Sequence, residues 1–301
     1  MSMPPKVWTI AELLQATTDF FFKRSVDEAR LSAELLLAHA LGCSRMSLYT
    51  QYDRVPGESQ RAAFREMVRQ RGEHVPVAYL VGKAWFYALE FTVNRDVLIP
   101  RPDTETLVEQ VISSVRGKPG WETPGILDLC TGSGCIAVTL AKNLPTATVT
   151  ATDLSEKALV VARGNAAEHK VGERIAFLQG DLWEAVDKMS PPAMFHVIAS
   201  NPPYVPTSGI AGLMPSVRDH EPRIALEAGK DGHAFHRRII AEAKGHLHDE
   251  GLLIQEMQFD QREGLVKIYE EAGWLESVRV LRDAAGHPRC VVGVKRAVAG
   301  G

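Results

Sequence analysis

Apolar residues recur at three- and four-residue spacing through the first part of the chain, which predicts amphipathic helices. Three segments show the pattern: TIAELLQATTDFFFKR, VDEARLSAELLLAHALG and GESQRAAFREMVRQRG. The first begins with a threonine, Thr9, that can cap a helix, and the second ends on Gly42, where a C-cap glycine is expected. No β-rich run interrupts these segments. Residues 1–75 are therefore predicted to form a small helical domain.

From about residue 125, short apolar runs alternate with helical segments. The runs GILDLC, ATVTATD, RIAFLQGD, FHVIAS and GLLIQEM read as buried strands, and SVRVLRD and RCVVGVK read as a closing antiparallel pair. Strands that alternate with helices predict a mostly parallel sheet that is covered on both faces, hence an α/β fold. We assign this domain to residues 102–301. Residues 76–101 alternate like a hairpin and are predicted to be a linker that packs on both domains.

The stretch LDLCTGSGCIA follows a strand and opens a helix. Its Gly132 and Gly134 allow a tight turn and a close approach to a ligand, although Ala137 stands where a dinucleotide fingerprint has its third glycine. Asp153 ends the following strand, at the edge of the expected crevice, and can accept hydrogen bonds from both ribose hydroxyls of an adenosine. The alternative is a helix-capping aspartate, but Ser155 is the better cap.

The stretch QGDLWEA ends the third strand of the series. Asp181 lies where a carboxylate can meet an adenine amino group, and Trp183 offers a face against which the ring can lie. The alternative for Trp183 is packing in the core.

The stretch ASNPPYVP stops a buried strand on two prolines, which cannot belong to a central strand because they lack the N–H that a sheet needs. An ordinary turn is the simpler interpretation. Over the same crevice, however, free carbonyls, the Asn201 amide and the flat Tyr204 ring would hold a planar amide or amino group. Such a weak nucleophile needs a strong electrophile in line, for example a sulfonium methyl, with orientation supplying most of the rate.

Composition narrows the possible functions. The 301-residue chain carries a formal charge of −3, from 34 basic and 37 acidic residues, which is no footprint for a phosphate backbone. Its four cysteines lack metal-ligand or redox spacing, since Cys130 and Cys135 flank the glycine loop, so no metal site is expected. The first residues, MSMPPKVWTI, contain no apolar run of signal-peptide length, and no stretch approaches a membrane span, so we expect a protein of the reducing cytoplasm without a membrane partner.

The motifs LDLCTGSGCIA, ATD, GDLW and NPPY, in this order, resemble class I S-adenosylmethionine-dependent methyltransferases that act on planar nitrogen. The segments LSAELLLAHALG, PVAYLVGKAWFYALEFTVNRDVLIPRPDTETLVE and RDAAGHPRCVVG resemble the protein-(glutamine-N5) methyltransferase family (PrmC/HemK), in its release-factor-specific branch. The resemblance covers nearly the whole chain. It implies a helical N-terminal domain that helps dock a peptide chain release factor, a hairpin linker, and a seven-stranded Rossmann-like domain that methylates the glutamine of a Gly-Gly-Gln motif.

The resemblance also assigns site residues by position. S-adenosylmethionine, which leaves as S-adenosylhomocysteine, would be held by Cys130, Thr131, Gly132, Ser133, Gly134, Asp153, Asp181, Trp183 and Asn201. The substrate glutamine would be held by Asn201, Pro202, Pro203 and Tyr204, and the catalytic roles would fall to Asn201, Pro202 and Tyr204. Two departures are that Cys130 replaces a common glycine, and that IQEMQ replaces Leu-Glu-Ile-Gly, which puts the contacts near Glu256 in doubt.

Three alternatives remain at this point. KAWF and CTGSGCIA also resemble the sister enzyme that methylates a glutamine of ribosomal protein uL3, although IPRPDTE and the helical N-terminal region favour the release-factor branch. A DNA or RNA amino-methyltransferase shares NPPY but should carry a basic face. A non-catalytic adaptor is disfavoured by the intact tetrapeptide beside an intact glycine loop. We expect a monomer with a protein substrate and no direct nucleic-acid contact.

Overall fold

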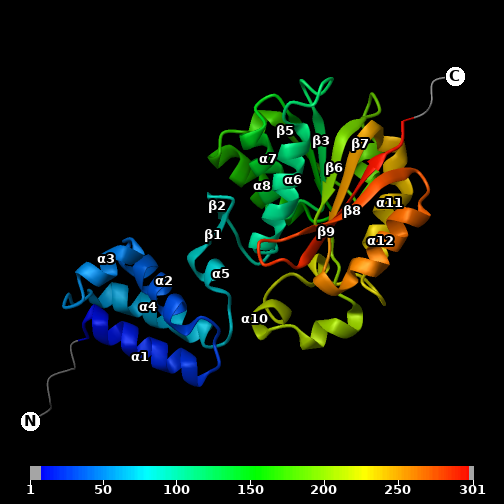
Figure 1. Ribbon diagram of the computed structural model, residues 1–301. Coiled ribbons are helices and arrows are strands. Elements are labelled where there is room, and N and C mark those ends of the chain that lie inside the picture. Colours follow the sequence, from blue (N-terminus) through cyan, green and yellow to red (C-terminus); the bar gives the residue numbers. More distant parts are fainter. Residues whose placement is uncertain (1–7, 298–301) are drawn as a thin grey trace, which may run out of the picture. The chain divides into compact units, whose positions relative to one another are not determined.

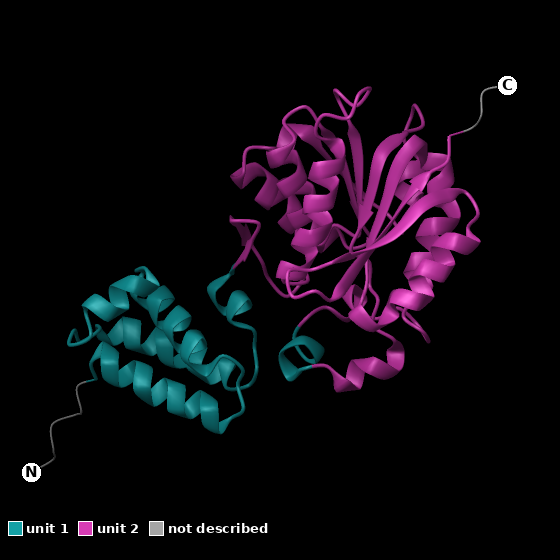
Figure 2. Cartoon of the chain, in the orientation of Figure 1, with its two compact units in different colours: residues 1–83, 214–220 teal, residues 84–213, 221–301 magenta. Residues whose placement is uncertain are grey.

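The computed structural model describes residues 8–297 and divides into two compact units (Figure 2). One unit comprises the chain up to residue 83 together with residues 214–220, and the other comprises residues 84–213 and the chain from residue 221 onward. The helical unit therefore runs eight residues beyond the expected boundary at 75, because a short helix, α5 (Val77–Val81), packs on the helical core.

The first unit contains α1 (Ile10–Lys23), α2 (Ala29–Leu41), α3 (Arg45–Thr50), α4 (Glu58–Arg71) and α5, and residues 214–220 add α10 (Pro215–Arg218). Three of these helices confirm the segments predicted from periodicity. Thr9 caps α1 in a capping box with Glu12, whose N–H donates to the Thr9 hydroxyl at 3.3 Å. Gly42 ends α2 in the left-handed conformation, with φ of 64°. Helix α3 was not predicted, because six residues are too few to show a period.

The second unit is built on a seven-stranded sheet in the order β5-β4-β3-β6-β7-β9-β8 (Figure 1). The strands are β3 (Gly125–Leu129), β4 (Thr148–Asp153), β5 (Ile175–Gln179), β6 (Phe195–Ser200), β7 (Leu247–Glu256), β8 (Leu275–Arg282) and β9 (Pro288–Lys295). Strands β3 to β7 pair in parallel, and β9 runs antiparallel to both β7 and β8. The predicted α/β fold, with its closing antiparallel pair, is confirmed.

Helices cover both faces of this sheet, as Figure 1 shows. One layer consists of α6 (Glu105–Val115), α7 (Cys135–Asn143) and α8 (Glu156–Glu168), and the other of α11 (Ala234–His246) and α12 (Arg262–Glu271). Because side chains alternate along a strand, Ile126 packs in the first layer and Leu127 in the second. Continuous apolar strands are what a sheet buried on both faces requires.

A hairpin of β1 (Lys83–Phe86) and β2 (Leu89–Thr92) precedes the sheet. Phe86 and Phe91 pack in the core under α6, α7 and α8. The side chain of Asn165, on α8, accepts from Thr92 N at 2.8 Å and donates to the Ser133 carbonyl at 2.8 Å. The hairpin is thereby tied to the glycine loop.

The remaining elements are short and belong to the connections of the second unit. They are η1 (Pro102–Thr104), η2 (Gly172–Arg174), α9 (Glu184–Asp187), η3 (Thr207–Gly212), η4 (Arg223–Ala225) and η5 (Phe259–Gln261). Within residues 8–297, no helix combines the length and the apolar character needed to cross a lipid bilayer.

Candidate active site

A cavity opens at the carboxyl ends of β3, β4, β5 and β6, with about 950 Å³ of empty space that is partly open to solvent. Parallel pairing brings these strand ends together, since Leu129 of β3 lies opposite both Thr152 of β4 and Ser200 of β6. Eight of the sequence-predicted site residues line it: Cys130, Thr131, Gly132, Ser133, Asp153, Asp181, Asn201 and Pro203. The other four, Gly134, Trp183, Pro202 and Tyr204, are not among its lining residues.

The two glycines of the loop after β3 have different roles. Both have positive φ, 55° at Gly132 and 78° at Gly134. A Cβ at Gly132 would have no neighbour within 4 Å, so this residue leaves open space in the cavity wall, whereas a Cβ at Gly134 would come within 3.0 Å of the Ala162 Cβ. Gly132 therefore gives a ligand access to the backbone, and Gly134 allows α7 and α8 to pack closely.

Cys130 adopts the left-handed conformation, with φ of 64°. This conformation explains why a glycine is common there in the family that the sequence resembles. Burial raises the pKa of the Cys130 thiol, so the side chain stays neutral in the cavity wall.

Asp153 holds the loop and also faces the cavity. One carboxylate oxygen accepts from Gly132 N at 2.9 Å and the other accepts from Ser155 N at 2.9 Å. The helix α8 is capped by Ser155 instead, whose hydroxyl accepts from Ala158 N at 3.2 Å. Burial raises the pKa of Asp153. Since each carboxylate oxygen can accept a second hydrogen bond, the group can also hold two ligand hydroxyls.

Asp128 is a supporting residue that the sequence analysis missed. It lies within β3, is fully buried, and accepts from the Thr131 hydroxyl at 2.6 Å and from Ala137 N at 3.2 Å through one oxygen. Its other oxygen has no hydrogen-bond partner among the described residues, and burial raises the pKa of the Asp128 carboxyl group to about 7. The available signal was an acidic residue inside an otherwise apolar strand.

Asp181 and Trp183 have different surroundings in the structure. Asp181 lines the cavity and pairs with Arg238 at 2.8 Å. Trp183, by contrast, is 2% exposed, stacks on the His246 ring with centroids 4.6 Å apart, and donates to a backbone carbonyl of α11. The indole thus belongs to the core, which was the alternative interpretation. Its neighbour Leu182, with φ of 53°, lines the cavity at this point instead.

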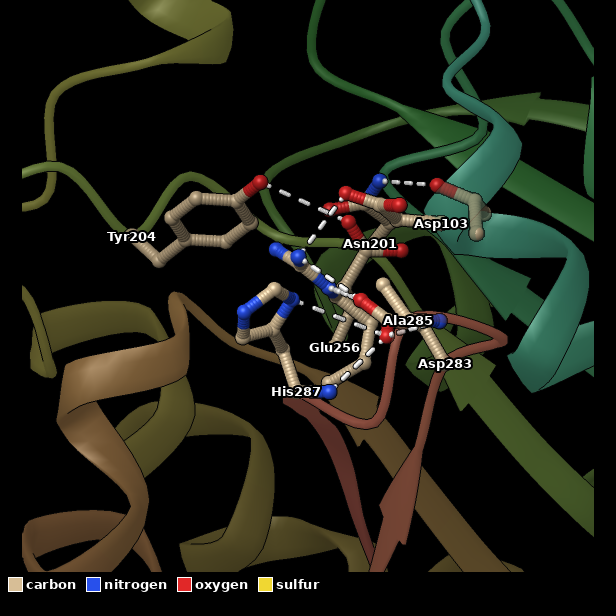
Figure 3. A network of polar contacts seen from close by, with 9 residues as sticks. Asp103, Asn201, Tyr204, Glu256, Asp283, Ala285 and His287 are labelled. Atoms are coloured by element: carbon tan, nitrogen blue, oxygen red, sulfur yellow. Dashed lines mark hydrogen bonds and ion pairs between the residues drawn. The ribbon is translucent and has the colours of Figure 1, made fainter.

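The Asn-Pro-Pro-Tyr segment leaves the sheet at the end of β6 and is held by side chains from other elements (Figure 3). The amide of Asn201 donates to the Thr104 hydroxyl at 3.1 Å. The Tyr204 hydroxyl donates to Glu256 at 3.4 Å, and the Tyr204 carbonyl accepts from Gln261 at 2.7 Å. The segment is therefore fixed at both of its ends.

Glu256 closes this network from the end of β7. It is 1% exposed, and its second oxygen has no hydrogen-bond partner among the described residues. Burial raises its pKa to about 7, while the nearby hydroxyls of Thr104 and Tyr204 and the Arg289 guanidinium favour the charged form. Arg289 itself bridges Asp103 at 2.9 Å and Asp283 at 3.0 Å (Figure 3).

The residues of the cavity fit an adenosine-containing cofactor such as S-adenosylmethionine. Asp153 suits the ribose hydroxyls, the open backbone at Gly132 admits close approach, and Leu182 offers an apolar contact for a ring. Beside them, the end of β6 presents Asn201 and Pro203 to the same cavity. This arrangement can hold a methyl donor and a planar nitrogen side by side. Among the described residues, no group of three or more His, Cys, Asp or Glu side chains has the geometry of a metal site.

Comparison with known proteins agrees with this geometry. The family described as PrmC N-terminal domain matches residues 12–82, and the family described as methyltransferase small domain matches residues 104–212. A release factor glutamine methyltransferase of Rhodopirellula baltica is 45% identical over 94% of this chain and 95% of its own length. A protein of the same name from Chlorobaculum tepidum is 44% identical over 85% of this chain and 87% of its own length. A methyltransferase structure from Pyrococcus furiosus shares the fold, with a TM-score of 0.51 and 21% identity, over 70% of this chain and 91% of that one.

Proposed function

The chain belongs to the release factor glutamine methyltransferase family, and we propose that its substrate is the glutamine of the Gly-Gly-Gln motif in peptide chain release factors. It is an S-adenosylmethionine-dependent methyltransferase, and the proposed acceptor atom is the side-chain amide nitrogen N5. One observation carries the proposal. Asn201 and Pro203 reach the same cavity as the glycine loop and Asp153, in a chain that matches a relative of this name over 94% of its length.

The cofactor would be held by the loop from Cys130 to Ser133 and by Asp153, with Leu182 against its base. When bound, it supplies an electrophilic methyl group on a sulfonium. Asn201 Oδ1 and the Pro202 carbonyl would each accept one N–H of the substrate amide, which directs the nitrogen lone pair. The partly exposed Tyr204 ring would lie along the amide plane, while its hydroxyl remains on Glu256. Orientation of a weak nucleophile in this way can supply several orders of magnitude in rate.

We also propose that the helical unit docks the release factor, that the protein is a monomer, and that it is located in the cytoplasm. The helical unit has its own apolar core, formed by residues such as Leu14, Phe21, Leu37 and Phe64, and none of its described residues is among those that line the cavity. All four cysteines are free thiols, as a reducing compartment would keep them.

Methyl transfer from labelled S-adenosylmethionine tests the proposal. The enzyme is incubated in parallel with a release factor, the same factor carrying alanine in place of the motif glutamine, ribosomal protein uL3, and RNA or DNA. We expect label only in the intact release factor, on the glutamine that peptide mass spectrometry identifies. Label in uL3 alone would favour the sister activity, and label in nucleic acid would overturn the proposal.

Asn201→Ala tests the site within the same assay. Loss of a positioned polar group at the reacting centre should lower kcat by roughly two to three orders of magnitude. Binding of S-adenosylhomocysteine should fall much less, because the ribose and adenine contacts lie on other strands. Asn143→Ala, on α7 away from the cavity, is the matched control. If Asn201→Ala turned over at nearly the wild-type rate, the segment would be only a turn.

A further inference from the structure

The side chain of Thr104 is used in an unusual way. Thr104 is the N-cap residue of α6, where a threonine hydroxyl normally accepts from a backbone N–H of the first turn. Here its side chain makes no capping hydrogen bond. The residue is 1% exposed, its hydroxyl accepts from the Asn201 amide at 3.1 Å, and it lies near enough to the buried Glu256 carboxylate to favour the charged form of that group.

The chemistry of these three groups sets the direction of each hydrogen bond. A threonine hydroxyl has one proton and two lone pairs, whereas Glu256 in its charged form, which the Thr104 hydroxyl and the Arg289 guanidinium favour, can only accept. With Glu256 charged, the Thr104 proton is directed to the carboxylate, and the Thr104 hydroxyl accepts from Asn201. With the amide reversed, Asn201 Oδ1 would face the Thr104 oxygen with no proton between them, which is unfavourable in a buried site.

We propose that Thr104 is a positioning residue that sets which end of the Asn201 amide faces the substrate. Its acceptor lone pair holds Asn201 Nδ2, and Oδ1 is then the end available in the cavity that Asn201 lines. An oxygen in this position accepts from the N–H groups of a carboxamide and disfavours a carboxylate. Thr104 would thus contribute to the selection of glutamine over glutamate, which rests on the function proposed above.

Thr104→Val tests this inference, because it keeps the shape of the side chain and removes the hydroxyl. With a release factor as substrate, kcat should fall about 10- to 100-fold, since a misplaced group at a reacting centre costs this much. KM for the factor and binding of S-adenosylhomocysteine should stay within about twofold of wild type, in keeping with the small loss expected of a group remote from docking. Thr104→Ser, which retains the hydroxyl, should restore most of kcat.

Two further readouts separate positioning from direct contact and from loss of folding. In an Asn201→Ala background, Thr104→Val should cause no further loss of kcat, because both changes remove the same interaction. In the enzyme without substrate, the side-chain NH₂ signal of Asn201 in an ¹⁵N spectrum, identified by its loss in Asn201→Ala, should shift in Thr104→Val and return in Thr104→Ser. If Thr104→Val does not fold, as judged by circular dichroism, Thr104→Ala takes its place with the same readouts.

The outcomes distinguish this inference from the function on which it rests. Additive losses in the double variant, an unshifted NH₂ signal, or a Thr104→Val enzyme of wild-type kcat would overturn the positioning role. If the wild-type enzyme did not methylate any release factor while the NH₂ signal responded as expected, the proposed substrate would be wrong. The coupling between Thr104 and Asn201 would then stand.

Discussion

Replacement of Asp153 by alanine should separate cofactor binding from fold stability. In the proposed complex the carboxylate accepts two charge-assisted hydrogen bonds from the ribose, and their loss should cost on the order of 2–4 kcal/mol. This corresponds to about a 30- to 900-fold higher Kd for S-adenosylhomocysteine. Because Gly132 N and Ser155 N also lose their acceptor, the variant should lose about 1–2 kcal/mol of stability, partly offset since a buried carboxylate is removed.

Isothermal titration calorimetry with S-adenosylhomocysteine measures the first effect, and urea unfolding measures the second. Asp187→Ala removes a carboxylate on α9, outside the cavity, and serves as the charge-matched control. The wild-type affinity should also weaken as the pH falls toward the raised pKa of Asp153, because a protonated carboxyl accepts less well. A folded Asp153→Ala protein with a Kd within about threefold of wild type would refute the ribose assignment.

Three other predictions concern buried charge, backbone strain and docking. Burial raises the pKa of Glu256 from 4.5 to about 7, so the folded chain binds the proton of this carboxyl more tightly than the unfolded chain does. The resulting gain in unfolding free energy is fully present below pH 4.5 and is lost as the pH rises through 7. The unfolding free energy, measured by urea titration, should fall between acidic and alkaline pH by on the order of 3 kcal/mol less in Glu256→Gln than in the wild type. An equal fall in the two proteins would contradict this prediction. At Cys130, whose φ is positive, glycine should be more stable than alanine by about 1 kcal/mol in thermal unfolding, and equal stabilities would argue against strain. A chain that begins at Ala84 lacks the helical core but keeps the residues that line the cavity. It should still bind S-adenosylhomocysteine, as measured by calorimetry, but should methylate a release factor far more slowly than the full chain. Equal rates would refute the docking role.

Local patterns in the sequence were enough to predict most of the elements. Thr9, Gly42 and Ser155 mark helix ends through chemistry that involves only neighbouring residues, so their roles could be inferred without a fold. The alternation of strands and helices predicts a parallel sheet because such strands need crossovers. Once the sheet is parallel, the glycine loop, Asp153 and Asn201 must meet at its carboxyl edge. These residues do line one cavity in the structure.

The remaining features depend on contacts between residues far apart in the chain. Trp183 and Leu182 are neighbours in the sequence and are both buried in the same core cluster, but only Leu182 also lines the cavity, whereas the Trp183 indole donates to the Arg238 carbonyl of α11. The local sequence around Thr104 is that of an ordinary helix cap, and only the folded structure brings its hydroxyl to Asn201, which is 97 residues away in the chain. The pKa of Glu256 likewise reflects burial that no local pattern reveals. A sequence specifies backbone direction through short-range propensities, whereas the partner of a buried polar group is set by the tertiary packing that excludes water from it.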